Sequence, residues 1–349
     1  MKIIIPGGSG QVGTVLAREF HAGGHEVVVL SRKPGKAAWR TVEWNGETLG
    51  EWVSEFEAAD AIINLAGQSV QCRYTAENRK IITDSRLKST KIVGDAIAQA
   101  WKPPRVWLQA STATIYAHRY DAPNDEAAGI IGGSEPNAPD TWRFSIEVAT
   151  SWERALKDSP TPNTRRVAMR TAIVMNPDPG SPFDTILRLV KFGLGGQAGD
   201  GRQYMSWIHD RDFARAVLWL IEHPELEGPV NLAAPNPLTN SEFMRVLRSA
   251  WGMPFGLPAT EWMLELGAFI LQSETELILK SRRVIPTKLL QSGFTFQFPA
   301  WPEAAKELCQ RARRNERGNQ EEDSRAPKAR DGTAWGNAPG KGASEGSEH

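Results

Sequence analysis

The sequence has little cysteine, no excess of either charge and no long apolar run. Its 349 residues include only Cys72 and Cys309, too few for a disulfide framework, which favours a reducing compartment. The 41 basic and 41 acidic residues cancel, so nothing in the overall charge points to nucleic acid or an anionic membrane as the main partner. The longest apolar stretch, residues 262–271, contains Glu265 and is too short to span a bilayer.

Motifs for metal and triphosphate chemistry are also missing. There is no HExxH pair, no Cys/His cluster and no P-loop lysine, so the sequence gives no support for a metal site or for nucleotide hydrolysis. An apolar strand begins at residue 2, which leaves no room for a leader peptide. We therefore expect a cytoplasmic protein with no membrane partner.

The strongest signal is the stretch KIIIPGGSGQVG at residues 2–13. Its apolar run, glycine cluster and following helical pattern indicate a strand, a tight turn and a helix. In such a turn the glycines let the chain reverse, let a pyrophosphate approach the backbone and let helix and strand pack closely, while the helix N-terminus attracts the phosphates. An ordinary glycine turn is the alternative, but the strand before and the helix after favour dinucleotide binding. The residues predicted to contact the cofactor here are Gly7, Gly10, Gln11, Val12 and Gly13.

Apolar runs alternate with helical patterns along the rest of the first 235 residues. This rhythm indicates stacked βαβ units with right-handed crossovers, hence an α/β fold. The predicted strands are 26–30, 41–44, 60–65, 106–110, 166–175, 205–208 and 229–232. The predicted helices are 11–21, 49–56, 76–100, 144–156, 184–192 and 210–223, the last capped by Asp210, with a further helix opening after the capping box at Thr239.

The end of the chain has a different composition. From about residue 314 charged, Gly, Ala and Ser residues dominate, and Trp335 is the only large apolar side chain. A segment of this kind buries too little surface to offset its ordering entropy. We predict that residues 312–349 form a disordered tail.

The residues after the second expected strand, 26–30, indicate whether the cofactor is NAD or NADP. Proteins specific for NAD place an Asp or Glu there to bind the ribose 2′-hydroxyl, but this chain continues Ser31-Arg32-Lys33. Arg32 offers paired donors that suit a 2′-phosphate, and Ser31 adds a hydroxyl. A solvated basic turn is the alternative. Because Arg32 directly follows the strand, we predict NADP rather than NAD.

Three stretches carry a family resemblance: the glycine turn, Asn64-Leu65-Ala66-Gly67, and residues 111–116 (STATIY). With them the chain resembles the extended short-chain dehydrogenases/reductases. Four more stretches, at residues 84–90, 151–153, 170–174 and 206–210, narrow the resemblance to an atypical branch, the YfcH-type NAD(P)-dependent epimerase/dehydratase-like family. The likeness covers residues 1 to about 311.

This resemblance implies a Rossmann-type doubly wound parallel sheet with a smaller C-terminal substrate lobe. It implies an NADP-binding domain at residues 1–178 and 203–234, and a substrate lobe at 179–202 and 235–311. It further implies that Leu65, Ala66 and Gly67 line the adenosine side of the cofactor, and that the substrate is a small molecule. Many extended members pair through two helices, so the resemblance also implies a homodimer formed by residues 76–100 and 144–156.

The chain departs from the family at the catalytic acid. The family's mechanism uses a Tyr with a Lys four residues later, but the resemblance puts Phe144 and Val148 at these positions. Of the polar groups that remain, Thr112 matches the family's Ser/Thr and Tyr116 follows the same strand, so both are our candidate catalytic residues. For Thr112 the alternative is a structural role at the strand end. For Tyr116 the alternative is an aromatic ring packed under the loop.

Three weaker candidates have equally ordinary explanations. Glu126 is a proton acceptor or a solvated loop residue. His209 faces the cleft or is packed. Arg86 contacts a phosphate, a substrate carboxylate or a Glu of its own helix face.

The sequence is compatible with two functions. One is an NADP-linked oxidoreductase or epimerase-like enzyme acting on a small polar substrate. The other is a non-catalytic module that binds NADP(H) and reports redox state. Phe144 and Val148 disfavour an orthodox sugar-nucleotide epimerase.

Overall fold

The fold is built on one parallel sheet. The computed structural model describes residues 1–136, 138–259 and 276–325. Seven parallel strands follow the order β10-β6-β5-β4-β1-β2-β3. Their bounds are β1 Lys2–Pro6, β2 Glu26–Ser31, β3 Arg40–Glu43, β4 Ala61–Asn64, β5 Val106–Thr112, β6 Arg165–Thr171 and β10 Gly228–Leu232. The order reverses between β1 and β4, and this reversal is the switch point at which such sheets bind ligands.

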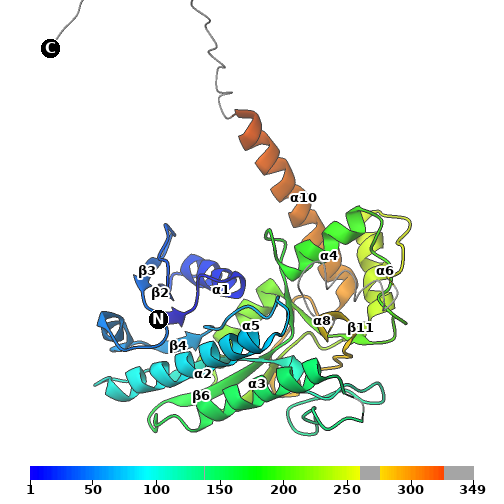
Figure 1. Cartoon of the computed structure of the whole chain (residues 1–349). Coiled ribbons are helices and arrows are strands. Elements are labelled where there is room, and N and C mark those ends of the chain that lie inside the picture. Colours follow the sequence, from blue (N-terminus) through cyan, green and yellow to red (C-terminus); the bar gives the residue numbers. More distant parts are fainter. Residues whose placement is uncertain (137, 260–275, 326–349) are drawn as a thin grey trace, which may run out of the picture. The chain divides into compact units, whose positions relative to one another are not determined.

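Helices cover both faces of this sheet (Figure 1). Helices α1 (Gln11–Ala22) and α5 (Asp210–Glu222) pack together on one face, and α2 (Ala76–Gln99) and α3 (Asp140–Lys157) pack together on the other. Two short 3₁₀ helices, η1 (Glu51–Phe56) and η2 (Ala113–Ile115), follow β3 and β5. The predicted Rossmann-type sheet is confirmed.

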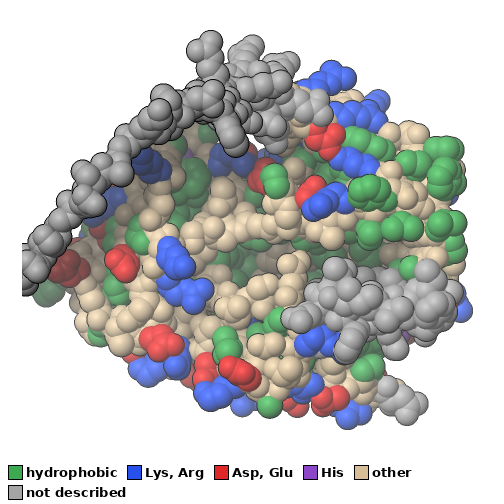
Figure 2. Space-filling view, turned by 45° about the horizontal axis from the view of Figure 1, so that its top comes forward, with side chains coloured by type: hydrophobic (Ala, Val, Ile, Leu, Met, Phe, Trp, Pro, Cys, Tyr) green, Lys and Arg blue, Asp and Glu red, His purple; other side chains and the backbone are tan. Residues whose placement is uncertain are grey.

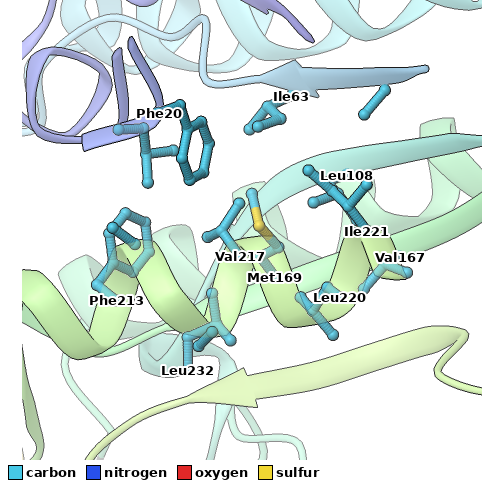
Figure 3. Packing of buried hydrophobic residues seen from close by; sticks show 14 of the residues in the cluster. Phe20, Ile63, Leu108, Val167, Met169, Phe213, Val217, Leu220, Ile221 and Leu232 are labelled. Atoms are coloured by element: carbon cyan, nitrogen blue, oxygen red, sulfur yellow. The ribbon is translucent and has the colours of Figure 1, made fainter. Parts of the chain in front are cut away.

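Alternation along the strands produces these two buried layers. Ile3 and Ile5 point toward α1 and α5, whereas Ile4 points toward α2 and α3, because successive side chains of a strand face opposite sides. Figure 3 shows the first layer, in which Phe20 of α1 lies near Phe213 of α5. Both faces are buried, which explains why the strands read as continuous apolar runs.

The C-terminal part has an apolar core of its own. It is formed by β9 (Trp207–His209), α4 (Pro182–Lys191), α6 (Asn240–Trp251) and α10 (Trp301–Arg325). The Trp301 ring stacks on Phe243 with centroids 4.0 Å apart. The remaining elements are β7 Ile173–Met175, β8 Tyr204–Met205, β11 Leu238–Thr239, α8 Glu276–Leu279 and α9 Thr287–Gln291. We call this part the C-terminal lobe; the division of the chain into the two predicted domains stays a prediction.

Several predicted boundaries differ from the structure. The strand expected at 166–175 is split into β6 and β7, and the one at 205–208 into β8 and β9. The expected helix at 49–56 is the shorter 3₁₀ helix η1. His209, rather than Asp210, is the N-cap of α5: its Nδ1 accepts from the Arg211 N–H over 3.2 Å, whereas Asp210 is the first helical residue and its carboxylate accepts two hydrogen bonds from Arg311.

The predicted tail is helical over its first part. The chain divides into two units, Met1–Ala312 and Arg313–His349, but helix α10 continues to Arg325. The prediction of disorder was wrong for this stretch, because a composition that forbids a core still contains helix-forming Arg, Glu, Gln and Ala. Residues 326–349 and the apolar stretch 262–271 lie outside the described residues.

The outer surface is mixed in charge. On the face shown in Figure 2 acidic and basic side chains are interspersed, as expected of a chain with no net charge. The exposed side of α2 carries the ion pairs Lys80–Asp84 and Lys91–Asp95. In each pair the two residues are one helical turn apart. The α2 surface of the predicted homodimer would therefore include these charged pairs beside the exposed Ile81. None of the helices in the described ranges is long and apolar enough to cross a membrane.

The burial pattern along α10 predicts how much of the chain's end the fold needs. Leu308 is fully buried, whereas residues 313–318 are exposed. We expect Leu308→Ala to lower the free energy of unfolding by about 2–5 kcal/mol, because it leaves a cavity. A chain that ends at Arg313 should keep the melting temperature of the full chain within a few degrees. Urea and thermal unfolding measure both, and a large loss in the truncated chain would mean that the tail docks on the fold.

Candidate functional site

The glycine turn after β1 is a cradle without side chains. Gly7 has a φ of +75°, and a Cβ atom there would lie 2.7 Å from the backbone of Ala66. A Cβ on Gly13 would lie 2.4 Å from Gly8 Cα. Gly10 is different: its nearest neighbour, the Gly7 carbonyl oxygen, is 3.7 Å from the added Cβ. Two glycines are therefore needed by the fold itself, and Gly10 keeps a space open.

That space lies at the first turn of α1. Gly10 is the N-cap and no side chain caps the helix, so the N–H groups of the first turn, which includes Gln11 and Val12, keep their capacity to bind an anion. Since the helix dipole also favours negative charge there, the residues present fit a pyrophosphate. The geometry of the turn is therefore compatible with an anion at the start of α1.

The Asn64–Gly67 turn after β4 lies directly beside this cradle. The Leu65 N–H donates to the Pro6 carbonyl over 2.8 Å, and the Ala66 N–H donates to the Asn64 side chain over 3.1 Å. A Cβ on Gly67 would meet the Arg86 guanidinium at 3.3 Å. The predicted residues Leu65, Ala66 and Gly67 are therefore brought next to Gly7 by the strand order.

Helix α2 braces this turn. The Arg86 guanidinium donates to the carbonyls of Gln68 and Ile82, each over 3.0 Å, and lies 4.9 Å from the Trp152 ring centroid. Burial lowers the pKa of Arg86 to about 10, so it remains charged at neutral pH. The Ser89 hydroxyl reaches the Ala66 carbonyl over 3.4 Å. Arg86 is thus engaged by backbone carbonyls and an indole ring, and not by a Glu of its own helix.

The end of β2 completes the same edge. The Ser31 hydroxyl donates to the Ser9 hydroxyl, 3.0 Å away in the glycine turn, and is buried. Arg32 is exposed, and within the described ranges it has no hydrogen-bond or ion-pair partner. A free guanidinium at this edge is what a bound 2′-phosphate would require. Ser31 is fixed by the turn, whereas Arg32 is available.

Thr112 and Tyr116 leave the end of β5 in different directions. The Thr112 hydroxyl accepts from the Thr114 N–H over 3.1 Å and so caps η2, in a half-buried position. Tyr116 is only 2% exposed. Its hydroxyl donates to Asn231 Oδ1 and accepts from Arg170 Nη1, each over 2.9 Å. Tyr116 is therefore the packed aromatic of the alternative interpretation, and its expected reach into the cleft is not observed.

Arg170 extends this contact into a buried polar network. Its guanidinium makes two hydrogen bonds of 2.8 Å to the Glu153 carboxylate, which also accepts from the Ser111 hydroxyl over 2.7 Å. Burial raises the pKa of Tyr116 despite the opposing charge of Arg170. The network ties α3, β5 and β6 together, so it serves the fold.

Phe144 and Val148 form an apolar patch where the family has its acid. They are 7% and 8% exposed. They cluster with Tyr74, in the loop before α2, and with Ile82 of α2. The Phe144 and Tyr74 rings meet edge to face with centroids 4.9 Å apart. Neither Phe144 nor Val148 offers a proton or a charge.

Glu126 and His209 are also held by the protein. Glu126 accepts from the backbone N–H groups of Asn231 and Lys288, at 2.9 and 3.3 Å, which is neither of its predicted roles. His209 is fully buried; its Nε2 lies 3.0 Å from Glu307 Oε2 and its ring stacks on Phe298 at 3.9 Å. Both therefore act as structural contacts.

Comparison with known proteins agrees with this architecture. The model of the NAD dependent epimerase/dehydratase family matches residues 3–139, and a domain of unknown function, DUF1731, matches residues 259–308. The epimerase family protein SDR39U1 of Bos taurus is 31% identical over 312 residues, which is 88% of this chain and 99% of that protein. The chain belongs to the epimerase family that includes SDR39U1. The predicted family resemblance is confirmed.

Other members of this epimerase family span bacteria and mammals. Epimerase family protein ML0860 of Mycobacterium leprae is 32% identical, with 84% of this chain and 91% of that protein covered. The crystal structure of human SDR39U1 (isoform 2) with NADPH superposes with a TM-score of 0.77 at 29% identity, covering 89% of this chain and 99% of that one. MoeE5 in complex with UDP-glucose and NAD, at 18% identity and a TM-score of 0.67, shares the fold.

Sequence reasoning missed the charged groups that the C-terminal lobe brings to the site. Lys280 Nζ donates to the Thr114 carbonyl over 2.8 Å, and Arg282 Nε donates to the Thr114 hydroxyl over 3.2 Å. Both come from the DUF1731 region of this epimerase-family chain. They lie 166 and 168 residues from Thr114 in the sequence. Lysine and arginine at the end of a short helix give no local signal that separates them from surface residues.

The Tyr116 network predicts a stability effect with a defined pH dependence. Tyr116→Phe leaves Arg170 and Asn231 each short of a buried partner, so we expect a loss of about 1–3 kcal/mol in the free energy of unfolding near pH 8. Because folding raises the pKa of this tyrosine, the wild type should lose stability as the pH rises above about 10. The difference in the free energy of unfolding between wild type and Tyr116→Phe should therefore decrease above about pH 10.

Urea unfolding at pH 8 and above pH 10 measures this difference. Tyr120→Phe is the matched control, since that side chain is 40% exposed and should change stability by less than about 0.5 kcal/mol. Equal stability of Tyr116→Phe and wild type at pH 8 would contradict the structural role of the hydroxyl.

Proposed function

We propose that this chain is an NADP(H)-dependent oxidoreductase or epimerase-like enzyme that acts on a small polar substrate. The observation that carries the proposal is the cradle between β1 and β4. There the backbone of Gly7 touches that of Ala66, the first turn of α1 has no side-chain cap, and Gly10 leaves room for a phosphate. The NADPH bound to human SDR39U1 supports the same cofactor for this chain.

The residues that would hold the cofactor follow from this geometry. The N–H groups around Gly10, Gln11 and Val12 would bind the pyrophosphate. The small Ala66 and Gly67 would flank the adenosine, and Ser31 and Arg32 would bind the 2′-phosphate. The nicotinamide would supply or accept a hydride at the carboxyl ends of the strands. Thr112 remains our predicted donor to a substrate oxygen, since its hydroxyl accepts from the Thr114 N–H and keeps its own proton.

Phe144 and Val148 favour a second candidate function. Their side chains cannot transfer a proton, so a module that binds NADP(H) and reports redox state remains the alternative. The two functions differ in turnover. Under the first, purified protein oxidises NADPH when a suitable carbonyl compound is present; under the second it binds NADPH without consuming it. Robust epimerisation of a UDP-sugar would contradict the second function, and it would mean that an acid/base group outside positions 144 and 148 serves an orthodox epimerase.

Arg32→Ala tests the preference for NADP. A charge-assisted hydrogen bond contributes about 1.5–3 kcal/mol, so the variant should bind NADPH about one to two powers of ten more weakly. Affinity for NADH should hardly change, because NADH has no 2′-phosphate. Fluorescence titration of both cofactors into wild type, Arg32→Ala and the control Lys36→Ala measures this. Equal affinity of the wild type for NADH and NADPH would refute the assignment.

Gly10→Ala tests the cradle without disturbing the fold. A Cβ there has 3.7 Å of clearance, so the melting temperature without cofactor should stay within a few degrees of wild type. We expect NADPH affinity to fall at least tenfold, since the methyl group occupies the space proposed for the pyrophosphate. Gly13→Ala is the contrasting variant: its Cβ would lie 2.4 Å from Gly8 Cα, so the fold itself should lose stability. Unchanged NADPH affinity in Gly10→Ala would place the pyrophosphate elsewhere.

A further inference from the structure

An enzyme with Phe144 and Val148 in place of a Tyr/Lys pair needs its proton-transferring group from another element. Phe144 and Val148 of α3 pack with Tyr74 and Ile82. The C-terminal lobe reaches the segment after β5 at Thr114 and reaches α3 at Ser145. This lobe therefore brings charged side chains to both segments.

Lys280 directly follows α8 and lies at the end of β5. Its Nζ donates to the Thr114 carbonyl, two residues after Thr112, and lies 3.8 Å from Glu276 Oε1. The Lys280 residue is 1% exposed, and among the described residues it is the only buried lysine. Burying an ammonium group is costly, so such a lysine at the carboxyl end of a parallel strand is a candidate for chemistry.

The groups around Lys280 come from three elements. Glu276 of α8 accepts a hydrogen bond from the Ser145 hydroxyl of α3, the residue after Phe144. Arg282 holds the Thr114 hydroxyl, and its Nη2 donates to the Glu276 carbonyl over 3.1 Å. On the loop after η2, Glu135 accepts from the His118 N–H over 2.9 Å, and both residues interact electrostatically with Lys280. The charged cluster thus joins η2, α3 and the C-terminal lobe.

We propose that Lys280 is the catalytic proton donor and acceptor of this protein, and that its substrate is a small carbonyl compound or the corresponding alcohol. The inference rests on the proposed NADP(H)-linked function. In the reducing direction the hydride pair from the nicotinamide forms the new C–H bond, and the carbonyl π pair takes the Lys280 proton to form the O–H bond. The products are the alcohol, oxidised cofactor and a neutral amine, which regains a proton from water.

The protonation behaviour of Lys280 suits this role. Burial and the charge of Arg282 lower its pKa to about 8, although Glu276 and Glu135 oppose the shift. The side chain is therefore mainly protonated at pH 7 and releases its proton just above it, which is the range in which an acid/base catalyst works best.

Trace acetylation measures access to Lys280 and its protonation together. Full-length protein, with and without NADPH, is treated with acetic anhydride between pH 6 and pH 10, and each lysine is followed by peptide mass spectrometry. We expect Lys280 to react with a midpoint near pH 8, well below the value of about 10.4 of a lysine in a model peptide. No reaction at Lys280 in the folded protein would overturn the proposal, since a lysine closed to acetic anhydride is closed to a substrate carbonyl. A midpoint at the model-peptide value would overturn it too.

Lys280→Arg separates proton transfer from the structural contact. Arginine keeps a charged donor for the Thr114 carbonyl but does not release a proton near neutral pH. We expect the variant to keep its melting temperature and NADPH affinity, and to lose at least 100-fold in NADPH oxidation with diacetyl or phenanthrenequinone, whereas Lys288→Arg behaves as wild type. Full activity in Lys280→Arg would overturn the proposal. If wild type reduces neither probe, the acetylation profile decides alone. Failure of wild type to bind NADPH would instead refute the proposed function.

Discussion

The contact between two backbone turns, one after β1 and one after β4, is the constraint on which the site depends. Gly7 and Ala66 approach so closely that no side chain fits at position 7. This approach is possible because the strand order reverses between β1 and β4, which makes these two strands neighbours. The Gly7 N–H also binds the Leu30 carbonyl, so three strand ends are fixed together. The uncapped first turn of α1 and the Ser31–Arg32 edge take their positions from this junction.

Most of the polar stretches that carry the family resemblance brace this arrangement. Arg86 of α2 binds the turn after β4. The Trp152 indole of α3 donates to the Thr90 hydroxyl of α2 over 3.0 Å. Glu153 and Arg170 tie α3 to the sheet. A motif shared with an enzyme family therefore does not by itself identify catalytic groups. In this protein Arg86, Glu153 and Arg170 hold helices against the sheet and its turns.

Features formed by residues close together in the sequence could be predicted from it. Contacts between residues far apart in the sequence could not. The cradle at Gly7–Gly13 was predictable because a strand, a turn and a helix follow one another within a dozen or so residues. The orientation of Tyr116 was not, since its partner Asn231 is 115 residues away. Lys280 meets Thr114 across 166 residues. The helical end of α10 was missed for another reason: low apolar content excludes a core, and helix propensity is a separate property.

Thr114 has a consequence for how the site opens. One residue binds two cations of the C-terminal lobe, Lys280 through its carbonyl and Arg282 through its hydroxyl. Within the lobe, the Ser206 hydroxyl donates to the Arg282 carbonyl over 2.6 Å and so holds this segment in place. Separation of the lobe from the sheet at this point breaks both bonds to Thr114 together, so partial opening gains little. Release of a molecule bound at this point would then require one cooperative opening step with a single barrier. A flexible loop, in contrast, passes through a continuous range of partly open conformations.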